Sequence, residues 1–529
     1  MDQAAVIGKT KNATFMIERL GDDIVLVGEA ERRFVSHDIW ARGELADFVL
    51  VPETTEQMIA CIKAAHEGGI ALSPRGGGMS YTKSSAPDRA GVGIVDTRKL
   101  NRIVEINADD MYVTVEAGCT WAQLHEALKP KGLRTPFWGP LSGILSTIGG
   151  GVAQNNAFFG TGTYGPTGDS VVAMSVVLAD GTLVRTGSAG TRNGAPFWRH
   201  YGPDLTGLFI GDSGAMGFKA EITLRLIPSP KHETWASYEF ETRDGCAKAM
   251  TEIAKQNLAC ELFGFDPNLT KVRMARASIL SDAKTLTNVM KAQGGLLKAL
   301  REGAKVAMAG RGFMADASYT LHFTVEGRSE AGLKEEISVL KALAEKHGGK
   351  AIENSIPKII RANPFTPLNN MLGPQGERWV PIHGIVPISK GPACWKALED
   401  GFERMADQFD KYNILTGALV TTMSTNGYLI EPVFIWPEEL FEIHEAAVEG
   451  SVLSKYPRYK QNPDATAMVE TARQFVLDTF SQFGAAHFQI GRTYPYVEGR
   501  DPDSLRLVET IKAALDPDCR VNPGVLGLG

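Results

Sequence analysis

The feature that most constrains this chain is a run of three glycines placed directly after a short apolar segment, in IALSPRGGGMSY (70–81). Because glycine has no Cβ, consecutive glycines let several backbone N–H groups converge on one anionic group. No Lys-Ser/Thr pair follows the run and its spacing is not GxGxxG, so it is neither a Walker A loop nor a Rossmann turn. The run predicts an anion-binding loop, with an ordinary tight loop as the alternative.

Short strands and helices alternate around this loop. A capped helix is expected over 120–132, with Thr120 as N-cap and Gly132 as stop. An Asp-Gly pair at 180–181 predicts a hairpin within 170–187. This order of elements is typical of an α+β fold with short units. The other expected elements are strands in 47–54, 70–81, 91–100, 101–110 and 111–120 and a helix over 55–69.

A change of texture after Pro228-Ser229-Pro230 predicts a domain boundary. Longer amphipathic helices then appear, over 329–349 and 391–412. We expect a first domain over 1–230, a second α+β domain over 231–484 and a C-terminal segment over 485–529.

Composition excludes several classes of protein. The net charge of −6 is spread along 529 residues without a Lys/Arg block, so no nucleic-acid surface is expected. The six cysteines are scattered, which argues against a metal site and against disulfides and fits a reducing compartment. Neither a signal peptide nor a membrane span is expected, so the protein is predicted to be cytoplasmic.

Six segments in order resemble the flavoprotein family of vanillyl-alcohol oxidase and p-cresol methylhydroxylase, whose superfamily includes the D-lactate and glycolate FAD dehydrogenases. The tail ALDPDCRVNPG (514–524) resembles the family again. The resemblance implies an FAD domain interrupted by a substrate (cap) domain, with the C-terminus returning to the FAD side. The six segments are SPRGGGMSY, IVDTRKLNRIVEIN, VTVEAGCTWAQLHEAL, STIGGGVAQNN, VVLADGTLVRTG and FIGDSGAMGFKAEITL.

The resemblance implies where FAD binds. The loop would hold the pyrophosphate, two segments would run along the ribityl chain and the ring, and a third would line the adenine side. Gly118 and Gly217 have plain turn roles as their alternative. The implied cofactor residues are Pro74, Arg75, Gly76, Gly77, Gly78, Met79, Ser80, Gly118, Ser146, Thr147, Gly150, Gly151, Gly214, Gly217, Ile222 and Asn522.

Covalent flavin is possible but not favoured. Relatives with a linking histidine in the glycine loop carry it where this chain has Met79. VPIHGIVPIS resembles the cap segment that bears the flavin-linked histidine of vanillyl-alcohol oxidase, which makes His383 the candidate. A histidine in an apolar strand is more often a packed core residue.

Resemblance to the phenol-oxidising branch assigns Tyr81 and Arg492 to the substrate. We expect them to meet over the flavin and to bind one anionic oxygen. The branch's aspartate falls where Ala153 and Gln154 stand, so His487 or Tyr494 is the expected base. The implied reaction takes a hydride from the benzylic carbon of a 4-hydroxyphenyl substrate (a lignin-type aromatic alcohol or a 4-alkylphenol) and passes through a quinone methide.

Two alternatives stay open. AAHFQIGR also resembles the D-2-hydroxy-acid dehydrogenase branch, with His487 as base and Arg492 as carboxylate clamp. That branch's metal-binding HGHxGDGN is absent, and we expect no metal. The other alternative is a flavin fold that serves as a binding subunit without redox activity. The electron acceptor (dioxygen, a cytochrome or a quinone) stays undetermined, and a homo-oligomer, with a homodimer as its simplest form, is expected.

Overall fold

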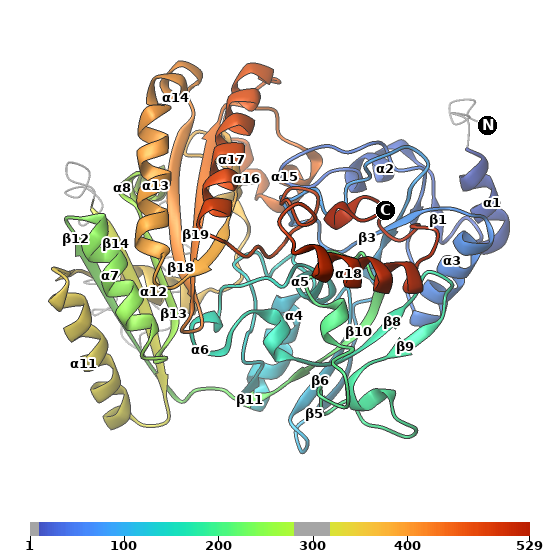
Figure 1. Ribbon diagram of the computed structural model, residues 1–529, viewed down its shortest axis with the longest axis horizontal. Coiled ribbons are helices and arrows are strands. Elements are labelled where there is room, and N and C mark those ends of the chain that lie inside the picture. The colour runs from blue at the N-terminus through green and yellow to red at the C-terminus, as the bar shows by residue number, and fades with distance from the viewer. Residues whose placement is uncertain (1–9, 280–317) are drawn as a thin grey trace.

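The computed structural model describes residues 10–279 and 318–529, arranged as two lobes side by side (Figure 1). One lobe is formed by the N-terminal part of the chain together with the C-terminal segment. The other is formed by the middle of the chain. The mixed helix-and-sheet architecture confirms the predicted α+β class. The predicted boundary between residues 230 and 231 falls between β11 and β12 and remains a proposal.

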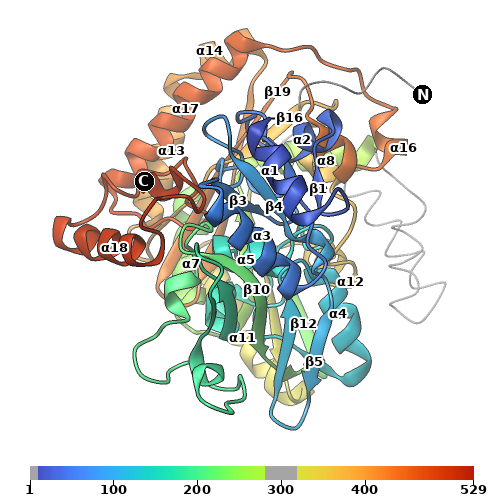
Figure 2. The same cartoon turned by 90° about the vertical axis from the view of Figure 1, so that its right-hand side faces the viewer.

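The glycine loop follows directly after a strand of a small four-stranded sheet. Its order is β1-β2-β4-β3, and β2, β4 and β3 are parallel. Leu50 and Val95 pack under α1 and α3, whereas Val49 and Ile94 pack on the opposite face with Val35 of α2 (Figure 2). The elements are α1 (Lys11–Leu20), β1 (Val25–Leu26), α2 (Glu29–Val35), β2 (Val49–Leu50), α3 (Thr55–Glu67), β3 (Leu72–Arg75) and β4 (Gly93–Asp96).

A five-stranded antiparallel sheet completes this lobe, in the order β5-β6-β10-β8-β9. The predicted hairpin is confirmed, because β8 pairs with β9 across Asp180-Gly181. The Thr120 hydroxyl accepts from the Gln123 N–H, which confirms Thr120 as N-cap of α4. The elements are β5 (Ile103–Asn107), β6 (Tyr112–Glu116), α4 (Trp121–Leu128), β7 (Leu133–Arg134), α5 (Ile148–Gln154), α6 (Thr161–Tyr164), β8 (Val171–Val177), β9 (Leu183–Arg185), β10 (Phe218–Arg225) and β11 (Ile227–Pro228).

The second lobe is built on an eight-stranded antiparallel sheet. Seven strands follow the order β15-β12-β14-β13-β18-β19-β16, and β17 also pairs with β19. The strands are β12 (His232–Phe240), β13 (Ala259–Phe265), β14 (Tyr319–Gly327), β15 (Lys350–Ala351), β16 (Arg378–Pro381), β17 (Gly384–Pro387), β18 (Leu415–Met423) and β19 (Gly427–Trp436). The helices are α7 (Arg243–Ala254), α8 (Pro267–Ile279), α11 (Glu330–Lys346), α12 (Ser355–Ala362), α13 (Gly391–Arg404), α14 (Ala406–Tyr412), α15 (Glu442–Ala447), α16 (Gly450–Leu453) and α17 (Pro463–Gln482).

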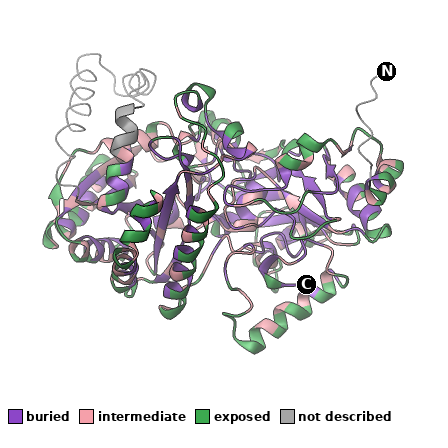
Figure 3. Ribbon diagram, turned by 90° about the horizontal axis from the view of Figure 1, so that it is seen from above, coloured by how far each residue is buried: buried purple, intermediate pink, exposed green. Residues whose placement is uncertain are grey.

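The two faces of the cap sheet have different partners. On β19, Tyr428, Ile430 and Phe434 pack into the core formed with α13 and α17. Val433 lies on the other face, in a cluster that includes Phe158 of the first lobe. Figure 3 shows the strands of both lobes as buried layers, with exposed residues concentrated on the outer helices. One face of the cap sheet is therefore directed at the lobe boundary.

The C-terminal segment returns to the first lobe. After α17 the chain crosses back and ends with α18 (Pro502–Leu515) beside the five-stranded sheet (Figure 1). The buried Lys512 ammonium donates to the Ala215 carbonyl at 2.8 Å. Val521 forms a parallel bridge with Leu72 of β3, next to the glycine loop. The end of the chain is thus part of the sheet edge that carries the loop.

A buried ion network joins the two lobes. Arg134 on β7 donates to both carboxylate oxygens of Glu326 on β14, at 2.7 and 2.5 Å. Arg361 on α12 also bonds Glu326, and it contacts Glu261 on β13 at 3.0 Å. Glu261 in turn accepts from the Gly160 N–H of the first lobe at 2.9 Å. These side chains are at most 8% exposed. Each charge is therefore stabilised by its protein partners and not by water.

Glu326→Ala is expected to lower the free energy of unfolding by about 3–5 kcal/mol, because it leaves two buried guanidinium groups without their shared carboxylate. Urea denaturation measures the change. Glu241→Ala is the matched control and should change stability little, since Glu241 and its partner Lys350 are exposed and water screens the pair. Equal losses in the two variants would contradict a locking role for the network.

Candidate active site

The glycine loop is pressed against the start of α5. A Cβ on Gly77 would lie 2.0 Å from the Leu145 carbonyl oxygen, and one on Gly76 would lie 2.2 Å from the Thr147 hydroxyl oxygen. Thr147 is the N-cap of α5 and accepts from the Gly150 N–H at 3.2 Å. Only glycine allows this approach, which places the loop and the N-terminal turn of a helix together.

The glycine loop lies against a buried guanidinium, that of Arg75. Arg75 is 2% exposed and donates from Nη1 to the His37 carbonyl at 2.7 Å, while its Nε and Nη2 have no partner in the described chain. Burial lowers the pKa of Arg75 to about 10, so the group stays charged at neutral pH. Within the described residues, no N–H from Gly77 to Ser80 donates to a protein atom. Free amides above an unpaired buried cation are what an anionic ligand requires.

Some of the other predicted cofactor residues lie beside the glycine loop, and others are packed elsewhere in the first lobe. Gly214, at φ +78°, packs on Pro74 beside the loop. Ser146 shares a hydrogen bond with Ser142 at 2.6 Å, and Met79 packs with the apolar cluster around Ile39. A Cβ on Gly118 would meet the Thr97 carbonyl at 2.0 Å, one on Gly217 would meet Val176, and one on Gly151 would meet Trp121. Ile222 lies in the core of the five-stranded sheet. The last four positions are thus closely packed, and their contact with the cofactor stays a prediction.

Arg492 has other partners than the sequence predicts. Its Nη1 donates to the carbonyls of Lys83, Ser84 and Ala86 at 2.6 to 3.1 Å. Its Nη2 donates to Asn522 Oδ1 at 3.0 Å and to the Pro523 carbonyl at 2.6 Å. Both terminal nitrogens are therefore used in tying the loop to the C-terminal tail. That the guanidinium also holds a substrate oxygen together with Tyr81 stays a prediction.

Asn522, predicted at the cofactor, belongs to the same connection. Its Nδ2 donates to the Ser84 carbonyl at 3.0 Å and to the Ser213 carbonyl at 2.8 Å. Together with Arg492 it joins three segments that are far apart in the sequence. Its side chain is 1% exposed, and its amide nitrogen is used in holding these segments together.

The structure brings the remaining predicted residues together in one aromatic cluster at the lobe boundary. The rings of Tyr81 and His383 lie 5.7 Å apart, and those of Tyr81 and Trp379 lie 6.3 Å apart. His383 stacks on Phe488 at 4.0 Å, and Tyr494 stacks on His487 at 4.3 Å. The loop, the strand β16 and the segment after α17 each contribute to it.

Hydrogen bonds fix the Tyr494 hydroxyl against His383. It accepts from the His383 N–H at 2.8 Å and lies 3.0 Å from the ring Nδ1, to which it can donate. Burial raises the pKa of Tyr494, although the charge of Arg473 opposes the increase. The imidazole of His383 is fully buried, which favours packing over a link to flavin.

The two histidines of the cluster are weak proton acceptors. Burial lowers the pKa of His487 to about 4 and that of His383 to about 3. Both rings are therefore neutral at neutral pH. His487 Nδ1 lies 3.3 Å from the His383 carbonyl. Low basicity weakens the expectation that His487 is the base.

Glu431 on β19 is the acidic residue that sequence reasoning missed. The Tyr81 hydroxyl donates to Glu431 Oε2 at 3.4 Å. Burial raises the pKa of this carboxyl to about 7, and the same cause raises the pKa of Tyr81 well above its usual range. The only signal in the sequence is one glutamate in the apolar strand YLIEPVFIW (428–436).

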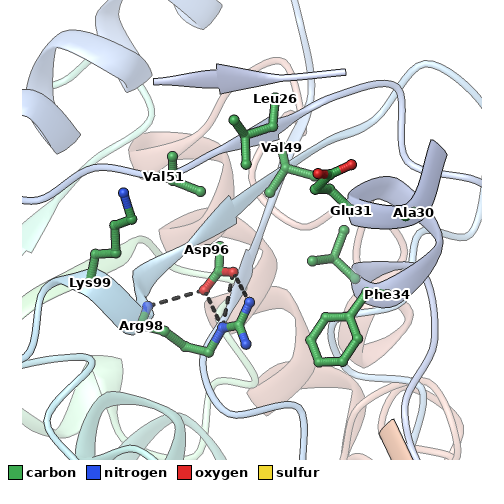
Figure 4. Close-up of a pocket in the computed structure, with 10 residues that line it drawn as sticks. Leu26, Ala30, Glu31, Phe34, Val49, Val51, Asp96, Arg98 and Lys99 are labelled. Atoms are coloured by element: carbon green, nitrogen blue, oxygen red, sulfur yellow. Dashed lines mark hydrogen bonds and ion pairs between the residues drawn. The ribbon is translucent and has the colours of Figure 1, made fainter. Parts of the chain in front are cut away.

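A separate pocket lies in the small parallel sheet (Figure 4). It has a volume of about 500 Å³ between α2 and the strands β2 and β4. Phe34, Val49 and Val51 line it, and the Asp96–Arg98 ion pair forms one wall, with a contact of 2.6 Å. None of the residues predicted for the site lines this pocket.

Two further findings concern residues 10–279 and 318–529. They contain no group of three or more His, Cys, Asp or Glu side chains arranged to hold a metal ion. They also contain no helix that is both long enough and apolar enough to cross a bilayer.

Comparisons with known proteins identify the first lobe. Residues 46–187 match the family described as FAD binding domain. The glycolate oxidase subunit GlcD of Bacillus subtilis is 30% identical over 40% of this chain and 43% of its own length. The D-lactate dehydrogenase [cytochrome] 1 of Saccharomyces cerevisiae is 32% identical over 44% of this chain and 38% of its own length. The chain thus matches about two fifths of the length of these relatives.

Solved structures match the whole fold. p-Cresol methylhydroxylase superposes with a TM-score of 0.72 at 18% identity, covering 98% of both chains. The 4-ethylphenol oxidase of Gulosibacter chungangensis gives 0.66 at 16% identity, covering 98% of this chain and 96% of its own. Residues 46–187 are therefore a domain of the FAD-binding family, and FAD is the cofactor. More particularly, the chain has the two-lobed fold of p-cresol methylhydroxylase, as its sequence motifs predict.

The residues present fit FAD. The free amides of Gly77 to Ser80 and the unpaired nitrogens of Arg75 suit its pyrophosphate. The glycines leave the space that a Cβ would fill. When bound, FAD supplies a hydride acceptor.

Gly77→Ala is expected to yield protein with little or no FAD, because its Cβ would lie 2.0 Å from the Leu145 carbonyl and would displace the loop. The flavin-to-protein absorbance ratio after purification measures the loss. Gly450→Ala is the control, since nothing lies within 4 Å of the added carbon. Full flavin content in Gly77→Ala would exclude this loop as the pyrophosphate site.

Arg492→Ala is expected to lower the free energy of unfolding by about 2–5 kcal/mol, since the charge-assisted bonds to the loop and the tail are lost. Arg492→Lys should recover little, because an ammonium does not reproduce the planar fork. Thermal and urea denaturation measure both variants. Normal stability combined with lost flavin reduction would instead restore the substrate role predicted from the sequence.

Proposed function

We propose that this protein is an FAD-dependent oxidoreductase that takes a hydride from the benzylic carbon of a 4-hydroxyphenyl substrate. The observation that carries the proposal is the aromatic cluster at the lobe boundary. In this cluster the hydroxyl groups of Tyr81 and Tyr494 lie among aromatic rings, including that of Trp379. Flat rings suit an aromatic substrate, and two tyrosine oxygens offer acceptors for its hydroxyl.

Each part of the site has its own task. The glycine loop and Arg75 hold the pyrophosphate of FAD and so fix the cofactor between the lobes. Tyr494, oriented by His383, and Tyr81, oriented by Glu431, bind the substrate hydroxyl through their oxygens. Phe488 and Trp379 keep water away from the reacting carbon. The cap sheet closes the space above the substrate ring.

A D-2-hydroxy-acid dehydrogenase is the second candidate. Identity of 30% to a glycolate oxidase subunit and 32% to a D-lactate dehydrogenase favours it. Arg492 does not separate the two candidates, because both readings assign it a substrate anion and both of its terminal nitrogens are bound to carbonyls and to Asn522. The flat aromatic rings of the cluster can pack against the ring of a phenol, whereas a small acid offers them no ring. The phenolic substrate is therefore the function that the site supports best.

Anaerobic mixing of the FAD-loaded protein with a substrate panel tests the proposal. 4-Hydroxybenzyl alcohols and 4-alkylphenols are expected to bleach the flavin absorbance, because loss of the phenolic proton makes the benzylic carbon hydridic. The matched 4-methoxy compounds have no such proton and should leave the flavin oxidised. Bleaching by D-lactate or glycolate alone would move the protein to the hydroxy-acid class.

A further inference from the structure

Glu431 is a single carboxyl on an otherwise apolar face of the cap sheet. Leu419 of β18 lies directly opposite it in the strand register. Leu429 and Val433 are two residues away on β19 and so point to the same face. All three are at most 7% exposed. A carboxyl in such a position is costly unless it has a function or a partner.

The partner of this carboxyl is the hydroxyl of Tyr81. Tyr81 Oη donates to Glu431 Oε2 at 3.4 Å, and Arg273 is the cation whose charge acts on this carboxyl. Glu431 is half-buried, on the sheet face that also carries Leu429 and Val433. The carboxyl is thus held at the substrate side of the sheet by the loop that binds the cofactor.

Three ionisable groups face Glu431 from the elements around it. Tyr81 approaches from the glycine loop, Arg273 from α8 and Tyr494 from the segment after α17. The charge of Arg273 and the Tyr81 bond lower the pKa of Glu431, but burial outweighs them and sets it at about 7. The carboxylate form therefore exists above about neutral pH and is lost as the pH falls.

We propose that Glu431 is the proton acceptor of this site and that Tyr81 relays to it the proton of the substrate hydroxyl. This inference rests on the proposed function. The substrate O–H bond breaks and its proton passes to Tyr81 Oη, while the proton of Tyr81 passes to Glu431 Oε2. The substrate oxygen keeps the electron pair of that bond. It forms the C=O bond of a quinone methide as the hydride leaves the benzylic carbon for FAD, which is reduced.

The alternatives for this role are poorer. Ala153 and Gln154 stand where the family resemblance places an aspartate. His487 and His383, with pKa values of about 4 and 3, hold a proton too weakly at neutral pH. A general acid–base group is most effective when its pKa lies near the working pH, which among these groups describes Glu431.

Infrared difference titration of the FAD-loaded protein tests the carboxyl without any reaction. The wild type is expected to lose a protonated-carboxyl C=O band with a midpoint near neutral pH, and Glu431→Gln to lack this band. A band that titrates with the ordinary glutamate pKa of about 4.3, or one unchanged in Glu431→Gln, would overturn the assignment.

Stopped-flow flavin reduction tests the transfer. In the wild type the reduction rate should fall as the pH drops through about 7. Glu431→Gln should reduce flavin about 100- to 10,000-fold more slowly at neutral pH, and its rate should rise only towards the phenol's own pKa of about 10. Ring-fluorinated or nitrated phenols, which ionise more easily, should recover most of the rate. Tyr81→Phe should show the same loss and the same recovery.

Glu399→Gln is the matched control. Glu399 also accepts from a tyrosine, Tyr319 at 3.2 Å, but it pairs with Arg243 and lies on α13, on the other face of the sheet. Its reduction rates and pH profile should equal those of the wild type. Two outcomes would leave Glu431 with a structural role only. One is a pH profile of flavin reduction in Glu431→Gln that keeps its midpoint near 7, and the other is an equal slowing of reduction by acidic and by ordinary phenols. If the carboxyl band titrates near neutral pH as expected but no phenol is oxidised, the proposed substrate is rejected. The assignment of the titrating carboxyl to Glu431 is then retained.

Discussion

A buried guanidinium with unpaired nitrogens is the constraint on which the rest of the site depends. Arg75 lies under the glycine loop with two of its nitrogens unpaired, and burial already lowers its pKa. Such a group is costly until an anion arrives. The energy of binding a pyrophosphate therefore includes relief of this cost, and the loop above needs its glycines so that the anion can come close enough.

Distant segments reach the loop by means of hydrogen bonds to backbone carbonyls. Arg492 and Asn522 bind the carbonyls that follow the loop, and Val521 bridges to β3. The aromatic cluster lies beside this connection, since His487 and Tyr494 belong to the same segment as Arg492. The position of the aromatic cluster is thus set in part by Arg492, whose partners are carbonyls although its motif resembles a catalytic one.

Much of the first lobe follows from local sequence rules. The glycine loop, the Thr120 cap and the Asp-Gly hairpin were predictable because each depends on residues adjacent in the chain. The roles of Arg492 and Glu431 were not. Arg492 matches a motif, but its partners lie some 400 residues away and are carbonyls, which no side-chain pattern reveals. Glu431 sits in a strand that is apolar on both faces, so alternation does not tell which face it occupies.

The pairing of Val521 with β3 also has a consequence for synthesis on the ribosome. Asn522 and Ser84, which bond in the finished lobe, are 438 residues apart, and the entire cap is made between them. At roughly 5–20 residues per second, the nascent FAD-binding lobe waits roughly 20 to 90 seconds for its last strand partner. The cap can meanwhile fold as a unit on its own sheet, whereas the edge of β3 stays open to chaperones. Flavin capture is therefore expected only after Val521 and Asn522 have emerged from the ribosome.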